Sequence, residues 1–168
     1  MSNEKLITAG YCGLACKACS VYIASQIGRE ALERRAAKAG MSAEEMYCKG
    51  CRSDKTSPYC TDCQIKRCIR EKNLTWCSEC EEYPCTKITE FKESLPHRAE
   101  IMDSLDFAKL HTVEEWDKLM EKEFTCENCG TYNSVYAESC SRCGNIPVNA
   151  FASRHWELIK DSEERKNL

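Results

Sequence analysis

The sequence predicts a small metal-stabilised α+β protein, in which a cysteine-rich knuckle region is followed by a helical middle and a C-terminal zinc ribbon. Fifteen of the 168 residues are cysteine, a share typical of chains whose fold depends on cysteine chemistry. Most of these cysteines form C-x2-C pairs, which suit one metal ion better than a disulfide between distant segments. The segments without cysteine carry apolar residues at helical spacing.

Cysteine use divides the chain into four expected parts. Residues 1–85 hold eleven cysteines and form the expected multi-metal region. Residues 86–123 hold none and are expected to be a helical connector. Residues 124–148 hold the remaining four, as the zinc ribbon, and residues 149–168 are expected to form a helical tail.

Metal binding is favoured over disulfides by the odd cysteine count, which would leave one thiol unpaired. The N-terminal stretch MSNEKLITAG has no apolar core of signal-peptide length. No apolar run approaches the roughly 18 residues that a membrane span needs. We therefore expect a cytoplasmic protein with reduced thiols and no membrane association.

One long helix is expected in the front part of the chain, over residues 21–39. Apolar residues recur along it at helical spacing, and Gly40 is a suitable end. Ser42 and Glu45 then make a capping-box pair ahead of the next cysteines.

Three helices are expected in the connector, and another over residues 150–160. Pro96 would end or kink the first, and Thr112 with Glu115 predicts a capping box at the start of the third. The apolar stripes of the three connector helices are Ile88, Phe91 and Leu95; Ile101, Leu105 and Phe107; and Trp116, Leu119 and Met120.

The clearest candidate site is a pair of knuckles near the C-terminus. Four cysteines form a C-x2-C-x10-C-x2-C motif: Cys126, Cys129, Cys140 and Cys143. Gly130 and Gly144 each follow a pair directly and permit the positive φ of a tight turn. Four thiolates close a tetrahedral shell, so a structural zinc ion is expected, with rubredoxin-like iron as the alternative.

The opening stretch YCGLACKAC places Cys12, Cys16 and Cys19 at C-x3-C-x2-C spacing. Three such thiolates can hold an iron–sulfur cluster that keeps one iron free. They can equally supply three ligands of a zinc site that a residue from elsewhere closes. The spacing leaves both possibilities open.

A short internal repeat follows the pair Cys48 and Cys51. Its two units share C-x2-C-x4-C spacing and consist of Cys60, Cys63 and Cys68, and of Cys77, Cys80 and Cys85. The repeat suggests two similar units, each contributing to its own site. Eleven cysteines are one fewer than three separate four-thiolate sites require, so at least one set is expected to be incomplete or to take another ligand.

Four stretches, YCGLACKAC, CKGCRSD, CQIKRCIREKN and CSECEEYPC, resemble a cysteine-rich bacterial and archaeal family classed as a domain of unknown function. Its members open with Tyr-Cys-Gly-Leu and end in a zinc-ribbon-like pair of C-x2-C knuckles. The resemblance runs over roughly residues 8–145. It implies a cytoplasmic prokaryotic metalloprotein and no established reaction. Radical SAM enzymes share the opening spacing, but they need a much larger barrel and usually an aromatic residue where Ala18 stands.

The expected function is a multi-zinc structural or interaction module. The alternative is an iron–sulfur protein, either an electron carrier or a small enzyme, with its cluster on the opening triplet. A labile thiol site for metal transfer or redox sensing is a third possibility. No phosphate loop or H-E-x-x-H motif points to a reaction, so whether the chain is an enzyme stays open. The net charge of −3 favours a protein partner over nucleic acid.

Overall fold

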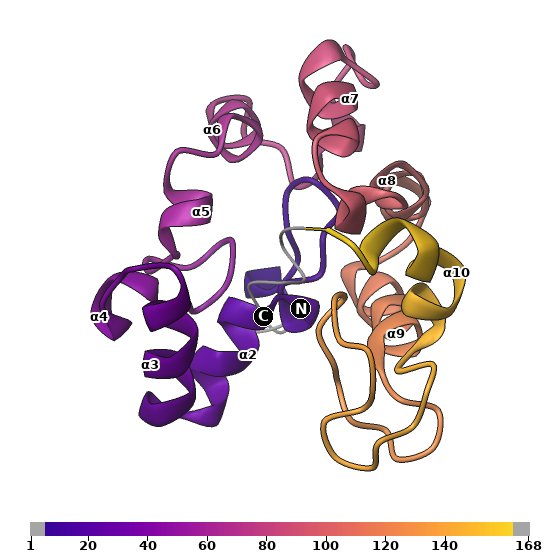
Figure 1. Cartoon of the computed structure of the whole chain (residues 1–168). Helices are drawn as coiled ribbons and strands as arrows, with labels where there is room; N and C mark the ends of the chain where they lie inside the picture. Colours follow the sequence, from indigo (N-terminus) through magenta and orange to yellow (C-terminus); the bar gives the residue numbers. More distant parts are fainter. Residues whose placement is uncertain (1–5, 163–168) are drawn as a thin grey trace.

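The computed structural model describes residues 6–162, and helices are its main regular secondary structure (Figure 1). Of the residues that the structure describes, 54% lie in helices and 3% in extended bridges, and these residues form no sheet. The described residues contain two isolated antiparallel bridges, Ala9 with Ala15 and Thr125 with Tyr132. The expected α+β class, including the zinc ribbon, is therefore wrong. The knuckle backbone closes tight turns instead of strand ladders, as in the 2.8 Å hydrogen bond from Gly130 N–H to the Cys126 carbonyl.

The front of the chain folds into short helices separated by cysteine-bearing turns. In chain order they are η1 (Cys16–Ala18), α2 (Ser20–Ile27), α3 (Arg29–Lys38), α4 (Ala43–Met46), α5 (Pro58–Thr61), α6 (Gln64–Glu71) and η2 (Cys77–Glu79). The back consists of α7 (Thr86–Glu93), η3 (Pro96–Arg98), α8 (Ile101–Leu110), α9 (Val113–Phe124) and α10 (Ala150–Ile159). Figure 1 shows α2 to α5 on one side of the molecule and α8 to α10 on the other, with the opening loop between them.

The single helix expected over residues 21–39 is in fact two helices. Gly28 lies between α2 and α3 with φ of 137°, a backbone conformation that side chains strongly disfavour. Because the chain reverses there, α2 and α3 pack against each other and, with α4, enclose a small apolar core. Gly40 ends the second helix as expected, and the capping box of Ser42 and Glu45 is confirmed.

The expected helices of the back half are confirmed in type, and α10 lies close to the expected residues 150–160, whereas Leu95 of the first expected stripe lies beyond the end of α7. The capping box of Thr112 and Glu115 begins α9, and Pro96 begins the short η3 turn that separates α7 from α8. Helix α10 packs on α9, with the rings of Phe124 and Phe151 5.4 Å apart. Residues 163–168 of the expected helical tail lie outside the described residues.

The main core joins the opening loop to the back helices. The Gly13 carbonyl accepts a 2.7 Å hydrogen bond from Ser104 Oγ, which also accepts one of 2.9 Å from the Trp116 indole. A Cβ at Gly13 would lie 2.9 Å from Leu105, so the loop can approach α8 this closely only with glycine there. This contact holds the segment between Cys12 and Cys16 on α8.

No helix in residues 6–162 combines the length and the apolar character needed to cross a bilayer.

Candidate metal centre

Four cysteine sulfurs converge at the C-terminal knuckles. The sulfurs of Cys126, Cys129, Cys140 and Cys143 all lie within 4.8 Å of one another. Cys126 Sγ is 3.6 Å from Cys143 Sγ, and Cys129 Sγ is 3.5 Å from Cys140 Sγ. A tetrahedral zinc ion with bonds of about 2.3 Å sets its sulfurs roughly 3.8 Å apart. This group can therefore hold a metal ion with little rearrangement.

Two tight turns aim these sulfurs inward. Gly130 and Gly144 have φ of 68° and 73°, and no heavy atom lies within 4 Å of the Cβ that either could carry. Glycine is therefore favoured by the backbone conformation and not by lack of space. The expected reason for both glycines is confirmed.

The same turns favour the thiolate form of two of the four cysteines. The backbone amide of Cys143 is the main cause that lowers the pKa of Cys140. The side chain of Asn128, followed by the amide of Asn145, lowers the pKa of Cys143. Hydrogen bonds to sulfur stabilise the anion, which is the form that binds a metal ion.

Asn133 is a buried contributor to this site that the cysteine spacing does not reveal. Its Nδ2 donates to Cys140 Sγ at 3.5 Å and to the Thr131 carbonyl at 2.7 Å. Its Oδ1 accepts two 3.0 Å hydrogen bonds, from the amide and from the hydroxyl of Ser141. The sequence could not predict this role of Asn133, because its contacts with Cys140 and Ser141 form only when the loop between the knuckles folds back.

The eleven N-terminal cysteines are less tightly gathered. Within residues 6–162, no second group of three or more metal-ligating side chains has all its ligand atoms within 4.8 Å of one another. All fifteen cysteines of the chain are free of disulfides. The N-terminal thiols nevertheless fall into two neighbourhoods, which differ from the groups that the sequence repeat suggests.

The first neighbourhood surrounds the opening loop. Burial raises the pKa of Cys12, and repulsion from the thiols of Cys51, Cys63 and Cys60 raises it further. Burial likewise raises the pKa of Cys16, with Cys51 again the foremost thiol neighbour. The opening triplet therefore shares its surroundings with cysteines from two other segments.

Cys19 and Cys48 complete this neighbourhood. Cys48 is the thiol that acts on Cys19, and both act on Cys60, whose pKa burial raises to about 12. Seven cysteines belong to the group: Cys12, Cys16, Cys19, Cys48, Cys51, Cys60 and Cys63. We call them the seven-cysteine set.

The second neighbourhood surrounds η2. Burial raises the pKa of Cys77 to about 12, and the thiols of Cys85, Cys80 and Cys68 add to the effect, in that order. Lys72 Nζ donates a 3.1 Å hydrogen bond to Cys80 Sγ. We call Cys68, Cys77, Cys80 and Cys85 the four-cysteine set.

Arg52 links the opening loop, which carries part of the seven-cysteine set, to the segment just before Cys77 of the four-cysteine set. Its guanidinium donates to the carbonyls of Ala9 at 2.7 Å and of Thr75 at 2.6 Å. It also lies 4.0 Å from the ring centroid of Tyr11 and 5.1 Å from that of Trp76. Burial lowers the pKa of this guanidinium, and the neighbouring Cys51 thiol partly opposes that effect. Arg52 thus places a cation beside the thiols, as a thiolate-rich site requires.

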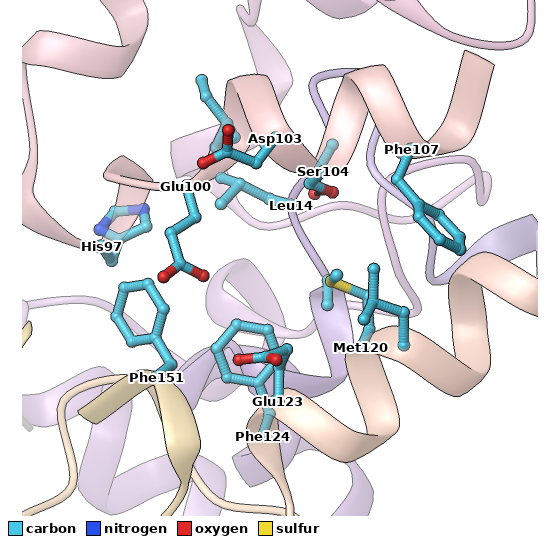
Figure 2. A pocket seen from close by; sticks show the side chains of 14 residues that line it. Leu14, His97, Glu100, Asp103, Ser104, Phe107, Met120, Glu123, Phe124 and Phe151 are labelled. Atoms are coloured by element: carbon cyan, nitrogen blue, oxygen red, sulfur yellow. Dashed lines mark hydrogen bonds between the residues drawn. The ribbon is translucent and has the colours of Figure 1, made fainter. Parts of the chain in front are cut away.

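A separate pocket of about 370 Å³ lies beside α8 and α9 (Figure 2). Figure 2 shows it lined by the rings of Phe124 and Phe151 and by the carboxylates of Glu100 and Glu123. Both carboxylates are paired with Arg154. Because both of these glutamates are already paired, this pocket is a weaker candidate for chemistry than the thiols.

The comparisons with known proteins give one match, to a family of unknown function. A search of curated proteins found no match, and a search of solved structures found none either. Residues 8–90 match the sequence model of a family described as "Protein of unknown function (DUF3795)". The match covers all eleven N-terminal cysteines and ends before the C-terminal knuckles. The resemblance expected from the sequence is therefore supported over residues 8–90, as similarity to a family of unknown function.

Proposed function

We propose that this protein is a cytoplasmic multi-zinc module, in which bound ions stabilise a helical scaffold that contacts another protein. All fifteen cysteines are its proposed metal ligands. The observation that best supports this proposal is the convergence of four sulfurs, those of Cys126, Cys129, Cys140 and Cys143. Such a shell has no open position for a substrate, which is typical of a structural zinc site and not of a catalytic one.

The energetics of a short chain support a structural role for the metal. Apparent zinc-binding free energies at structural sites are about 10–16 kcal/mol, and they contribute directly to folding. Residues 125–149, which join α9 to α10, contain no helix. Apart from the bridge between Thr125 and Tyr132, they form turns and loops. Most backbone hydrogen bonds of this segment are local turn contacts, as from Gly144 N–H to the Cys140 carbonyl, and an ion bound by the four thiolates would join the two knuckles.

The proposal is tested by metal analysis of protein purified without oxygen or chelators. We expect zinc without iron or acid-labile sulfide. Cys143→Ser should lose one ion per chain and lower the melting temperature. Ser139→Ala, an exposed change close to the same site, should retain both. Unchanged zinc content in Cys143→Ser would contradict the proposed site.

The alternative proposal places an iron–sulfur cluster on Cys12, Cys16 and Cys19. It is supported by the position of Cys19 as the N-cap of α2, where the backbone amides of Tyr22 and Val21 partly oppose the rise in the pKa of its thiol that burial causes. Amide donors and helix N-termini stabilise negatively charged clusters. It predicts iron, acid-labile sulfide and visible absorption, all lost when the three cysteines are replaced by serine. A colourless, iron-free preparation would exclude it.

A further inference from the structure

The loop between the two C-terminal knuckles packs on the opening segment of the chain. We call this loop, residues 130–139, the knuckle loop. The main-chain N–H of Val135, in the middle of the loop, donates a 3.2 Å hydrogen bond to the carbonyl of Ala18. Both residues are buried in the main core. Ala18 is the last residue of η1, and Cys19 follows it directly. The knuckle loop therefore contacts the opening segment within one residue of a candidate metal ligand.

Aromatic side chains of the knuckle loop add contacts with η1 and η3. The hydroxyl of Tyr136 is hydrogen-bonded to Nδ1 of His97 in η3, and the two rings meet edge to face with centroids 5.4 Å apart. The ring centroid of Tyr132 lies 6.0 Å from Nζ of Lys17 in η1. Lys17 also forms a 2.6 Å ion pair with Asp117, a buried carboxylate of α9. The η1 turn therefore contacts both the knuckle loop and α9.

The same loop is bonded to the C-terminal sulfur site. Asn133, two positions before Val135, donates to Cys140 Sγ and accepts from the amide of Ser141. The main-chain N–H of Asn133 also donates a 3.1 Å hydrogen bond to the carbonyl of Phe124, at the end of α9. Three consecutive residues, 133–135, therefore connect the four converging sulfurs to η1.

The knuckle loop has little regular structure of its own to maintain this connection. Residues 125–149 contain no helix, and their one bridge joins Thr125 to Tyr132. Ions at structural sites contribute their binding free energy to the folding of the segment that holds them. Loss of the C-terminal ion should therefore loosen the contact between Val135 and Ala18.

We propose that the C-terminal ion controls the order of the opening segment. When the C-terminal site is filled, the knuckle loop fixes η1 together with Cys16 and Cys19, and when the site is empty this segment loses its fixed position. The inference rests on the proposed zinc-binding function and adds coupling between the C-terminal site and the opening thiols. Such coupling is reciprocal, and a typical one changes affinity roughly 5–150-fold.

Helices α3 and α4 provide an internal control for this coupling. With α2 they enclose a separate apolar core, to which none of the buried knuckle-loop residues belongs. Val135, Tyr136 and Ala18 belong instead to the main core. Emptying the C-terminal site should therefore loosen η1 and leave α3 and α4 as they are.

Hydrogen exchange of the full chain in excess zinc, followed by mass spectrometry, tests the inference. Cys143→Ser, which removes a ligand of the C-terminal ion, should exchange the amides of residues 16–19 at least about 5-fold faster than the unaltered chain. Within this stretch the amides of Cys16, Ala18 and Cys19 donate backbone hydrogen bonds of 2.9–3.1 Å. Exchange in α3 and α4 should stay unchanged.

A pair of variants at Val135 separates the contact from the ion. Val135→Pro removes the N–H that donates to Ala18, whereas Val135→Ala keeps this donor and shortens the side chain. Both variants should keep the zinc content of the unaltered chain in native mass spectrometry. Only Val135→Pro should accelerate exchange over residues 16–19, as Cys143→Ser does.

Unchanged exchange over residues 16–19 in Cys143→Ser would overturn the coupling and leave the zinc-binding function in place. Equally fast exchange in α3 and α4 of that variant would show general unfolding and would also overturn it. Identical exchange in the two Val135 variants would overturn the role of this contact. If Val135→Pro does not fold, the comparison with Cys143→Ser still decides the question. An unaltered chain without zinc would overturn the proposed function itself.

Discussion

The backbone amide of Cys51 donates a hydrogen bond to the sulfur of Cys16, at 3.3 Å. The two residues are thirty-five positions apart in sequence, so the contact joins the opening loop to the turn after α4. An amide directed at a sulfur stabilises the thiolate and orients it, as second-shell donors do at metal sites. The contact therefore indicates which loops assemble the N-terminal thiols.

Metal should leave the protein in a defined order. The C-terminal sulfurs already lie within 4.8 Å of one another, whereas the N-terminal ones must be drawn together. Pre-organised ligands bind with less cost of ordering. During titration with a chelator, native mass spectrometry should therefore show the N-terminal ions leaving first. In Cys143→Ser, the ion that the unaltered chain releases last should be missing. Release of the C-terminal ion before the N-terminal ones would contradict this expectation.

Replacing Asn133 with alanine should weaken the C-terminal site without removing a ligand. The change deletes the donor to Cys140 Sγ and the acceptor for Ser141. Loss of such an outer contact typically lowers metal affinity about 10–100-fold. Competition with a chromogenic chelator measures the change. Asn133→Asp keeps the acceptor and should lose the affinity that depends on the donor, while Ser139→Ala should match the unaltered chain.

Arg52→Lys should destabilise the front of the molecule although the charge is kept. Lysine cannot donate to the carbonyls of both Ala9 and Thr75 with the guanidinium's planar geometry, nor lie flat on the Tyr11 ring. We expect a loss of about 2–4 kcal/mol in the free energy of unfolding, measured by urea denaturation of the metal-loaded protein. The exposed Arg67→Lys should change it by less than about 0.5 kcal/mol. Equal stabilities of the two variants would refute the role of Arg52.

His97 should make stability fall as the pH falls. Burial, followed by the adjacent Arg98, lowers the pKa of His97 to about 3, below the ordinary 6.5. The unfolded chain therefore takes up this proton first. The contribution of neutral His97 to the free energy of unfolding is complete above about pH 6.5. It declines as the pH falls towards 3, by at most about 1.4 kcal/mol per pH unit.

Comparison of His97→Asn with the unaltered chain separates the effect of His97 on stability from that of the thiols, because both proteins contain the same thiols. His97→Asn replaces the ring nitrogen that is hydrogen-bonded to Tyr136 with a group that does not titrate. Between pH 7.5 and 5.5 its free energy of unfolding should decline less steeply than that of the unaltered chain. Parallel curves would show that His97 does not contribute.

Local signals in the sequence predicted the back half of the fold well. The capping box at Thr112, the break at Pro96 and the helix starting at Ala150 all depend on residues within one helical turn. Gly28 shows the limit of this reasoning, since a glycine inside an apolar stripe is compatible with a continuous helix. Only the packing of α3 back onto α2 shows that the chain turns there.

The fold class was wrong because C-x2-C knuckles do not require strands. A knuckle needs a tight turn and amides directed at sulfur, and turns on either side of a loop provide both. In this chain the segments between knuckles bond locally, as in the 3.0 Å contact from Cys140 N–H to the Asn145 carbonyl. Spacing alone could not distinguish this arrangement from a β-ribbon.

By itself, the sequence determined which four C-terminal cysteines converge, the glycines that follow them and the caps of the longer helices, because each depends mainly on local turns and caps. Tertiary structure alone decided how the N-terminal thiols are divided. Cys63 and Cys68 belong to one repeat in sequence, yet Cys68 is a neighbour of Cys77 whereas Cys63 is a neighbour of Cys12. A ligand set is a property of long-range packing, since its sulfurs come from segments that meet only when the chain has folded.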